Sequence, residues 1–222
     1  MIVEAPSPNQ DDRPGTPIDI LMLHYTGMQT GQAAIDRLRD PAARVSSHYV
    51  VDEDGTVWHL VPEGRRAFHA GISYWRGHHT LNDRSIGIEI VNPGHEWGYR
   101  PFPAAQMDAV RALCLGILSR HPIPARNVVG HSDVAPDRKQ DPGELFDWPG
   151  LARAGIGLWP TAQALPVAPE AVEAALTAIG YPVPDLRTTL AAFQRRWRPG
   201  RVDGEADVKT RERLAAVAAL LA

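Results

Sequence analysis

The chain has 222 residues, of which 44% are hydrophobic and 22% are charged, a composition typical of a globular protein. Its formal net charge of −3 argues against a nucleic-acid-binding protein, which usually carries a basic excess. A chain of this length can bury a substantial core, and its single cysteine, Cys114, excludes an intrachain disulfide.

Strand and helix patterns alternate over residues 1–155. Apolar runs and period-2 alternation predict strands, whereas apolar positions at helical spacing predict helices. The expected elements, in chain order, are a strand at 18–24, a helix at 31–40, a hairpin within 46–61, a strand at 85–92, a helix at 104–120, a strand at 127–131 and a short helix at 146–155. This alternation predicts an α/β fold in which a mixed β-sheet is flanked by helices.

The character of the sequence changes after residue 155. Residues 156–169 are rich in proline and alanine and have no periodicity, which is typical of a linker. The remaining residues predict helices only, at 170–179, 186–197 and 207–221. We therefore expect one domain at 1–155, a linker at 156–169 and a small three-helix domain at 170–222.

The N-terminal segment lacks the basic and apolar regions of a secretory signal. No apolar stretch approaches the ~18 residues that a membrane span needs. These features predict a cytoplasmic protein without a membrane span. A periplasmic or cell-envelope location is the alternative if a leader was removed.

Two segments, LMLHYTG at 21–27 and GHSDVAPDRKQDPG at 130–143, carry the pattern of a metal site. The first places His24 at the end of an apolar run. The second places His131 after a small residue and Asp141 ten residues further on. Two imidazoles and one carboxylate are a common ligand set for catalytic Zn²⁺. The residues alone also permit ordinary core or surface histidines, so zinc is a hypothesis at this point.

A hydrolytic zinc site needs a proton acceptor and a group that stabilises an oxyanion. Glu89 interrupts an apolar strand, where partial burial would raise its pKa toward neutrality; the alternative is the solvent face of an edge strand. Lys139 is one of only two lysines beside 21 arginines. A lysine is therefore informative in this chain, although a solvated loop charge is the alternative. No G-x-S-x-G or H-E-x-x-H motif is present, which disfavours other common hydrolases.

Five segments occur in the order found in the type-2 N-acetylmuramoyl-L-alanine amidases, which the region 15–155 resembles. They are LMLHYTG, SSHYVVDEDGTVWHLV, RAFHAGIS, LNDRSIGIEIVN and GHSDVAPDRKQDPG. The resemblance implies the amidase/peptidoglycan-recognition fold, and Zn²⁺ on His24, His131 and Asp141. It implies Glu89 as general base and Lys139 as transition-state stabiliser. The implied reaction cleaves the amide between N-acetylmuramic acid, expected in its 1,6-anhydro form, and L-alanine, in peptidoglycan turnover or recycling.

The same resemblance predicts substrate-binding residues. His69 stands in the family's W-H-A-G segment, with Phe68 where tryptophan is usual. We also expect His48 and Asn82 to bind substrate. A carboxylate at Asp141, where other relatives carry cysteine, indicates the bacterial branch of the AmpD and AmiD type.

Residues 190–220 resemble a peptidoglycan-binding three-helix domain, with Asp207 in place of a usual glycine. The alternative is a helical cap that packs on the amidase and binds nothing. The expected partner is a muropeptide or peptidoglycan, without nucleic acid. Two other functions remain open, namely a non-catalytic peptidoglycan-recognition module and a zinc hydrolase for a different amide.

Overall fold

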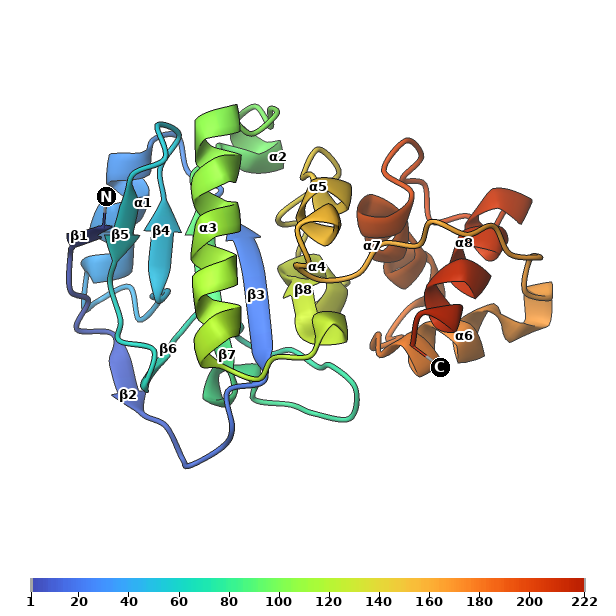
Figure 1. Ribbon diagram of the computed structural model, residues 1–222, viewed down its shortest axis with the longest axis horizontal. Coiled ribbons are helices and arrows are strands. Elements are labelled where there is room, and N and C mark those ends of the chain that lie inside the picture. Colours follow the sequence, from blue (N-terminus) through green and yellow to red (C-terminus); the bar gives the residue numbers. More distant parts are fainter. Residues whose placement is uncertain (1, 222) are drawn as a thin grey trace.

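A six-stranded mixed β-sheet forms the centre of the protein, in the computed structural model that describes residues 2–221 (Figure 1). The strand order is β1-β5-β4-β7-β3-β8. The bounds are β1 (Ile2–Glu4), β3 (Ile20–Tyr25), β4 (Tyr49–Val51), β5 (Val57–His59), β7 (Ser85–Ile90) and β8 (Val128–Gly130). Strands β4, β7, β3 and β8 run parallel, so their carboxyl ends lie at one edge of the sheet. A separate antiparallel pair joins β2 (Gln10–Asp12) to β6 (Arg65–Ala67).

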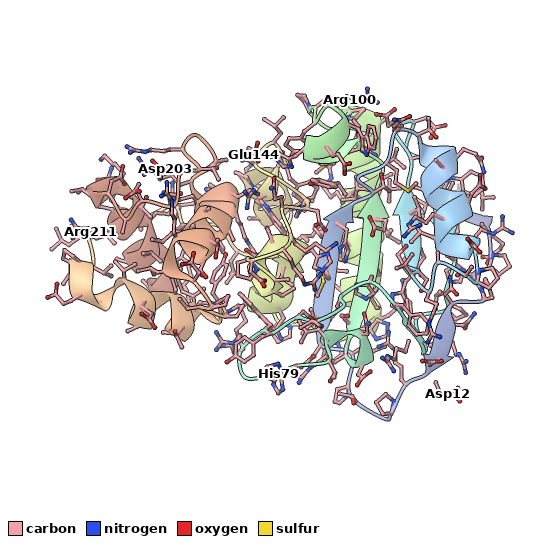
Figure 2. The ribbon with its side chains drawn as sticks, turned by 180° about the vertical axis from the view of Figure 1, so that it is seen from behind. Asp12, His79, Arg100, Glu144, Asp203 and Arg211 are labelled. Carbon is pink, nitrogen blue, oxygen red and sulfur yellow. The ribbon has the colours of Figure 1, made fainter. Side chains whose placement is uncertain are left out.

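Helices cover both faces of this sheet. The long helix α3 (Ala104–Arg120) packs on one face and α1 (Gly31–Arg39) on the other, as the two opposite views show (Figures 1 and 2). The remaining helices are α2 (Gly94–Trp97), α4 (His131–Val134), α5 (Trp148–Arg153), α6 (Val172–Ile179), α7 (Leu186–Trp197) and α8 (Val208–Ala219). Short 3-10 turns lie at Leu81–Asp83, Ala125–Asn127 and Pro169–Ala171.

Alternation along β3 and β7 decides which side chains face the site. Leu21 and Leu23 of β3 belong to the apolar cluster that contains the buried side chains of α3. Ile20 and Met22 belong to a different cluster, on the opposite face. Because side chains alternate with a period of two, His24 continues the second face, and Glu89 does so on β7. Both polar side chains therefore lie on the face of the sheet away from α3.

The C-terminal helices α6, α7 and α8 pack beside β8 and α4 (Figure 1). One apolar cluster joins Met22 and Val129 of the sheet to Leu176, Phe193 and Leu214 of these helices. The core thus continues from the sheet into the C-terminal part of the chain. The division into a domain at 1–155, a linker and a domain at 170–222 stays a prediction.

The expected α/β fold with a mixed sheet is confirmed, and each predicted element has a counterpart. The strands β1, β2 and β6 were not predicted, because their residues (IVE, QDD and RRA) are largely exposed or charged and lie outside any longer apolar or alternating run. The edge-strand alternative for Glu89 is wrong, since β7 lies between β4 and β3. Within residues 2–221, no helix combines the length and apolar character needed to cross a membrane.

Candidate active site

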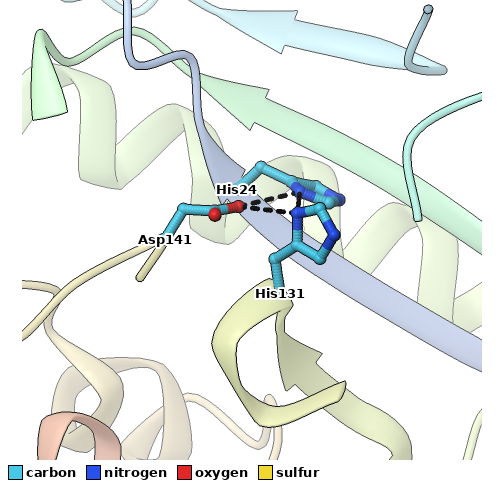
Figure 3. Close-up of side chains that lie close together, drawn as sticks. All are labelled: His24, His131 and Asp141. Atoms are coloured by element: carbon cyan, nitrogen blue, oxygen red, sulfur yellow. Dashed lines mark hydrogen bonds and ion pairs between the residues drawn. The ribbon is translucent and has the colours of Figure 1, made fainter. Parts of the chain in front are cut away.

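Three side chains meet at the carboxyl edge of the sheet: His24, His131 and Asp141 (Figure 3). His24 lies near the end of β3, His131 opens α4 directly after β8, and Asp141 lies in the loop beyond α4. The Nδ1 atoms of the two histidines are 3.0 Å apart, and Asp141 Oδ2 lies 3.0 Å and 3.1 Å from them. All three residues are buried. The backbone N–H of Ser132 donates to the Asp141 carbonyl at 2.9 Å, which ties the loop to α4.

The charge states of this trio suit a divalent cation. Burial, followed by the neighbouring His131, lowers the pKa of His24 to about 4, so its imidazole is neutral. Burial by itself favours the neutral form of Asp141. The charge of His131 and hydrogen bonds with both imidazoles outweigh burial and hold the pKa of that carboxyl well below its usual value. Metal ligands must be deprotonated, and the lowered pKa values of His24 and Asp141 meet that requirement. These residues can therefore hold a metal ion.

A chain of hydrogen bonds orients the ring of His24. Ser85 Oγ donates to the carbonyl of Leu81 at 2.6 Å, so it accepts from His69 Nε2 at 3.1 Å. His69 Nδ1 is then the acceptor for His24 Nε2 at 3.1 Å. This directionality places the His24 proton on Nε2 and leaves Nδ1 free toward the trio. Such outer contacts are what fix the tautomer and the ring orientation of a metal-binding histidine.

His131 is oriented in the same way. Its Nε2 lies 3.1 Å from the carbonyl oxygen of Ala70, a group that only accepts hydrogen bonds. The proton of His131 is therefore on Nε2, and Nδ1 is free toward Asp141. Both imidazoles thus offer the same ring nitrogen to the centre of the trio.

The close approach of His69 to the sheet depends on Gly87. A Cβ atom at this position of β7 would lie 2.5 Å from the His69 ring. Asn82 holds the same segment from the other side, since its Oδ1 accepts the backbone N–H groups of His69 and Ala70 at 3.0 Å and 2.7 Å. The segment 69–70 that orients both histidines is thus fixed by packing and by hydrogen bonds.

Glu89 is the register partner of His24 on the adjacent strand. Its Oε2 is buried and has no hydrogen-bond partner among residues 2–221. Burial, followed by the negative charge of Asp141, raises the pKa of Glu89 well above its usual value, and Lys139 opposes this shift. A carboxylate with an unsatisfied oxygen and a raised pKa has the properties of a proton acceptor.

A cavity of about 950 Å³ opens over the trio. Glu89, Lys139 and His69 line it together with His131 and Asp141. Further lining side chains come from β3, α1, α2 and the loop before Asp141; among them are Tyr25, Arg37, Trp97 and Arg138. We did not predict these four. Trp97 is 50% accessible, but this exposure is a property of the folded chain and was not available from the sequence.

Two of the three predicted substrate-binding residues lie elsewhere. His48 is fully buried, accepts the Gly87 N–H at Nδ1 and lies 3.0 Å from a guanidinium nitrogen of Arg13. Asn82 binds the backbone of 69–70, as described above. Neither residue lines the cavity. Their positions indicate support for the segment around His69, which itself lies in the cavity wall.

The family model described as N-acetylmuramoyl-L-alanine amidase matches residues 14–144, a range that contains the trio, Glu89 and Lys139. The chain belongs to this family. The resemblance to type-2 amidases of the AmpD and AmiD type is thereby confirmed, as is the prediction of an amidase.

Curated relatives differ in how much of the chain they match. The N-acetylmuramoyl-L-alanine amidase AmiD of Escherichia coli K12 is 40% identical, over 87% of this chain and 79% of its own length. The 1,6-anhydro-N-acetylmuramyl-L-alanine amidase AmpD of the same strain is 36% identical, over 65% of this chain and 86% of its own length. AmpD therefore matches a region too short to include all of the C-terminal helices.

Two solved structures match nearly the whole chain. The complex of E. coli AmiD with anhydro-N-acetylmuramic acid-L-Ala-D-γ-Glu-L-Lys has a TM-score of 0.81 and 38% identity, covering 92% of this chain and 90% of that chain. AmpDh3 from Pseudomonas aeruginosa, in complex with an anhydromuramic pentapeptide, has a TM-score of 0.83 and 33% identity, covering 91% of each chain. The C-terminal helices are thus part of a common architecture.

Proposed function

We propose that this protein hydrolyses the amide between N-acetylmuramic acid, in its 1,6-anhydro form, and L-alanine of a muropeptide. In this proposal Zn²⁺ is held by His24, His131 and Asp141. The observation that carries it is the buried trio with the unpaired Glu89 carboxylate beside it. Peptidoglycan turnover or recycling is the process in which such a reaction takes part.

The size of the cavity and the relatives both support the proposed substrate. Ligand sites usually enclose ~300–1,000 Å³, and this cavity of about 950 Å³ lies at the upper end of that range. AmiD and AmpDh3 were each solved with an anhydromuramyl peptide. The cavity wall adds the cations of Arg37 and Arg138, which suit the carboxylates of a stem peptide.

The trio fits a catalytic zinc ion rather than a structural one. It provides three protein ligands, two imidazole nitrogens and one carboxylate, and it opens onto a cavity. Structural zinc sites are usually closed by four protein ligands and are rich in cysteine. A zinc ion bound there would supply Lewis-acid activation of water and of the substrate carbonyl.

Glu89 is proposed as the proton carrier. Its unsatisfied Oε2 faces no protein donor among residues 2–221, so it is free to accept a proton from the attacking water. The raised pKa favours the protonated form relative to that of an exposed glutamate, which suits a group that must hold a proton during the reaction. The same carboxyl can then deliver that proton to the departing amine of L-alanine.

Lys139 is proposed to stabilise the oxyanion. Lys139 lines the same cavity, two residues before the proposed ligand Asp141. When water adds to the carbonyl, negative charge develops on the carbonyl oxygen. A fixed positive charge beside that oxygen lowers the energy of the transition state. His69 is proposed to line the substrate groove, with His48 and Asn82 supporting it.

Metal removal tests the proposal directly. Purified protein is stripped with a chelator, and release of the stem peptide from a soluble anhydro-muropeptide is measured before and after Zn²⁺ is restored. We expect activity to disappear and then to return. Full activity of the stripped protein would contradict the proposal. A substrate panel with peptide bonds in place of the lactyl amide separates this amidase from a zinc hydrolase for another amide.

The cellular location stays a prediction, with the cytoplasm expected and the periplasm or cell envelope as its alternative. Turnover of intact sacculi, compared with that of soluble anhydro-muropeptide, separates an enzyme that meets the polymer from one that acts on fragments. Fractionation of cells that express the protein from its native locus gives the compartment itself.

A further inference from the structure

We propose that helix α7 is a positioning element of the active site, through Arg196 and its partner Asp133. Arg196 extends from α7 and pairs with Asp133. Asp133 lies on α4, the helix that begins with His131 of the trio. In this view, removing the arginine disturbs the metal site itself. The inference rests on the proposed function, because it concerns the geometry of a proposed zinc ligand.

Arg196 and Asp133 form a buried ion pair. The Arg196 Nη1 to Asp133 Oδ2 distance is 2.5 Å, and the two side chains are only 3% and 0% accessible. The second terminal nitrogen of Arg196 donates to the carbonyl of Val128 on β8 at 2.9 Å. One guanidinium therefore contacts both the strand and the helix on either side of His131.

Two tryptophans hold the guanidinium in place. Its central carbon lies 4.2 Å from the ring centroid of Trp148 on α5 and 4.3 Å from that of Trp197 on α7. Cation–π contacts of this kind are strongest where the charge is desolvated, as it is for Arg196. The two rings thus restrict rotation of the planar guanidinium. A lysine at this position would not reproduce this, because its ammonium group is not planar.

Asp133 transmits this constraint to the turn that presents His131. Its Oδ2 also accepts the backbone N–H of Gly130 at 2.8 Å, and its Oδ1 accepts the hydroxyl of Tyr181 at 2.5 Å. Gly130 and Asp133 flank His131, so the aspartate closes a short loop around the ligand. Without Arg196, the buried carboxylate of Asp133 loses its charged partner. An unpaired buried charge is unfavourable, so the Asp133 side chain is expected to shift toward solvent.

The neighbouring Arg195 extends the contact between α7 and the cavity. Its Nε lies 3.7 Å from Glu144, which pairs with His95 at 3.1 Å, and His95 lines the cavity. Two consecutive arginines of α7 thus pair with carboxylates of the amidase region, Arg195 with Glu144 and Arg196 with Asp133. This arrangement favours a helical cap that supports the amidase over a separate module joined by a flexible linker.

The test compares two arginine variants of the same helix. Arg196→Met removes the buried charge but keeps most of the side-chain volume. Arg187→Met is the matched control, because the Arg187 side chain is 73% accessible and, among residues 2–221, its guanidinium makes only a long ion pair with Glu205. Zn²⁺ affinity of the stripped proteins is measured by competition with a chromogenic chelator, at a temperature where circular dichroism shows a folded chain. The absorption spectrum of the Co²⁺-loaded protein reports the geometry of the ligands.

We expect Arg196→Met to weaken Zn²⁺ binding by about 10- to 100-fold, the range found when supporting residues of metal sites are removed. The Co²⁺ spectrum should change, and Arg187→Met should match the wild type in both measurements. A folded Arg196→Met variant with wild-type affinity and spectrum would overturn the inference alone. A wild-type protein that binds no Zn²⁺ would instead contradict the proposed function.

Tyr181→Phe provides a second variant in case Arg196→Met does not fold. It removes one hydrogen bond to Asp133 and keeps the ring. We expect a several-fold loss of Zn²⁺ affinity with a smaller change in the Co²⁺ spectrum. If Arg196→Met is unfolded and Tyr181→Phe binds Zn²⁺ as tightly as the wild type, the pair contributes to stability only and the inference fails.

Discussion

His24 and Glu89 lie directly opposite each other on the adjacent parallel strands β3 and β7. Strand pairing alone therefore places a proposed metal ligand beside a proposed proton carrier, on the face of the sheet away from α3. Because the register of a sheet is set by its whole apolar pattern, a slip by one residue would bury one side chain under α3 and separate the two. β7 is an inner strand of the sheet, and Glu89 lies on the wall of the cavity beside the trio.

Glu89→Gln should reduce kcat by about 10²- to 10⁴-fold, the usual contribution of a positioned general base. The amide keeps the size of the side chain but cannot accept the proton. Muropeptide binding, measured by calorimetry, should be retained. Glu173→Gln, a change at an exposed position of α6, serves as the control. A Glu89→Gln variant that cleaves at the wild-type rate would remove Glu89 from the mechanism. A wild-type protein that binds but never cleaves would indicate a recognition module.

Lys139→Met should lower kcat by about 10²- to 10³-fold with little change in KM, because the charge acts on the oxyanion of the transition state. Lys139→Arg should recover only part of this loss, since a guanidinium places its charge differently from an ammonium. The other lysine of the chain offers a matched control, Lys209→Met, whose side chain is 72% accessible. Equal losses in kcat for both methionine variants would argue against a specific role for Lys139.

Ser85→Ala should weaken Zn²⁺ binding by about 10-fold, as expected for the loss of an outer contact of a metal-binding histidine. The hydroxyl is the acceptor that fixes the His69 tautomer and, through it, the free Nδ1 of His24. Chelator competition on the folded variant measures the effect. Ser119→Ala, at an exposed position of α3, is the control. Unchanged affinity in Ser85→Ala would show that the ring orientation of His24 does not depend on this chain.

Glu63 should make the stability of the protein depend on pH. Partial burial would raise the pKa of Glu63, but hydrogen bonds from Arg120, His121 and Tyr49 outweigh it and lower the pKa to about 2. A lowered pKa in the folded state adds stability above the unfolded value, near 4.5, and this stability is lost as the pH falls toward 2.

Glu63→Gln should therefore reduce the free energy of unfolding at pH 7 by about 1–3 kcal/mol, the range for hydrogen bonds to a charged group. Denaturant unfolding of the wild type and the variant at pH 7 and at pH 3 measures this difference. The difference should be smaller at pH 3 but not zero, because pH 3 lies between the unfolded pKa near 4.5 and the folded pKa of about 2. A difference that grows on acidification would have the wrong sign and would contradict the assigned hydrogen bonds.

Much of the sheet was predictable because its central strands are long and apolar. The strand at β3 and the helix at α3 were expected within two residues of their bounds, since burial imposes a period of 2 on one and 3.6 on the other. The short strands β1, β2 and β6 carry no such pattern. They form because neighbouring strands offer them hydrogen-bond partners, which local sequence does not encode.

The trio was predictable because metal binding requires particular residue types, histidine and aspartate, and these stand in recognisable sequence motifs. The residues that orient it were not. His131 finds its acceptor 61 residues away at Ala70, and Asp133 finds Arg196 63 residues away. His48 and Asn82, expected to bind substrate, also make contacts of this kind with residues distant in the chain.

Sequence by itself determined the class of fold, the family and the candidate chemistry of His24, His131, Asp141, Glu89 and Lys139, because local periodicity and motif spacing reflect short-range constraints. The tertiary structure decided which ring nitrogens are free, which residues line the cavity and how α7 supports the site. Those features depend on contacts between segments that are distant in the chain, and such contacts exist only after the sheet has set the register of its strands.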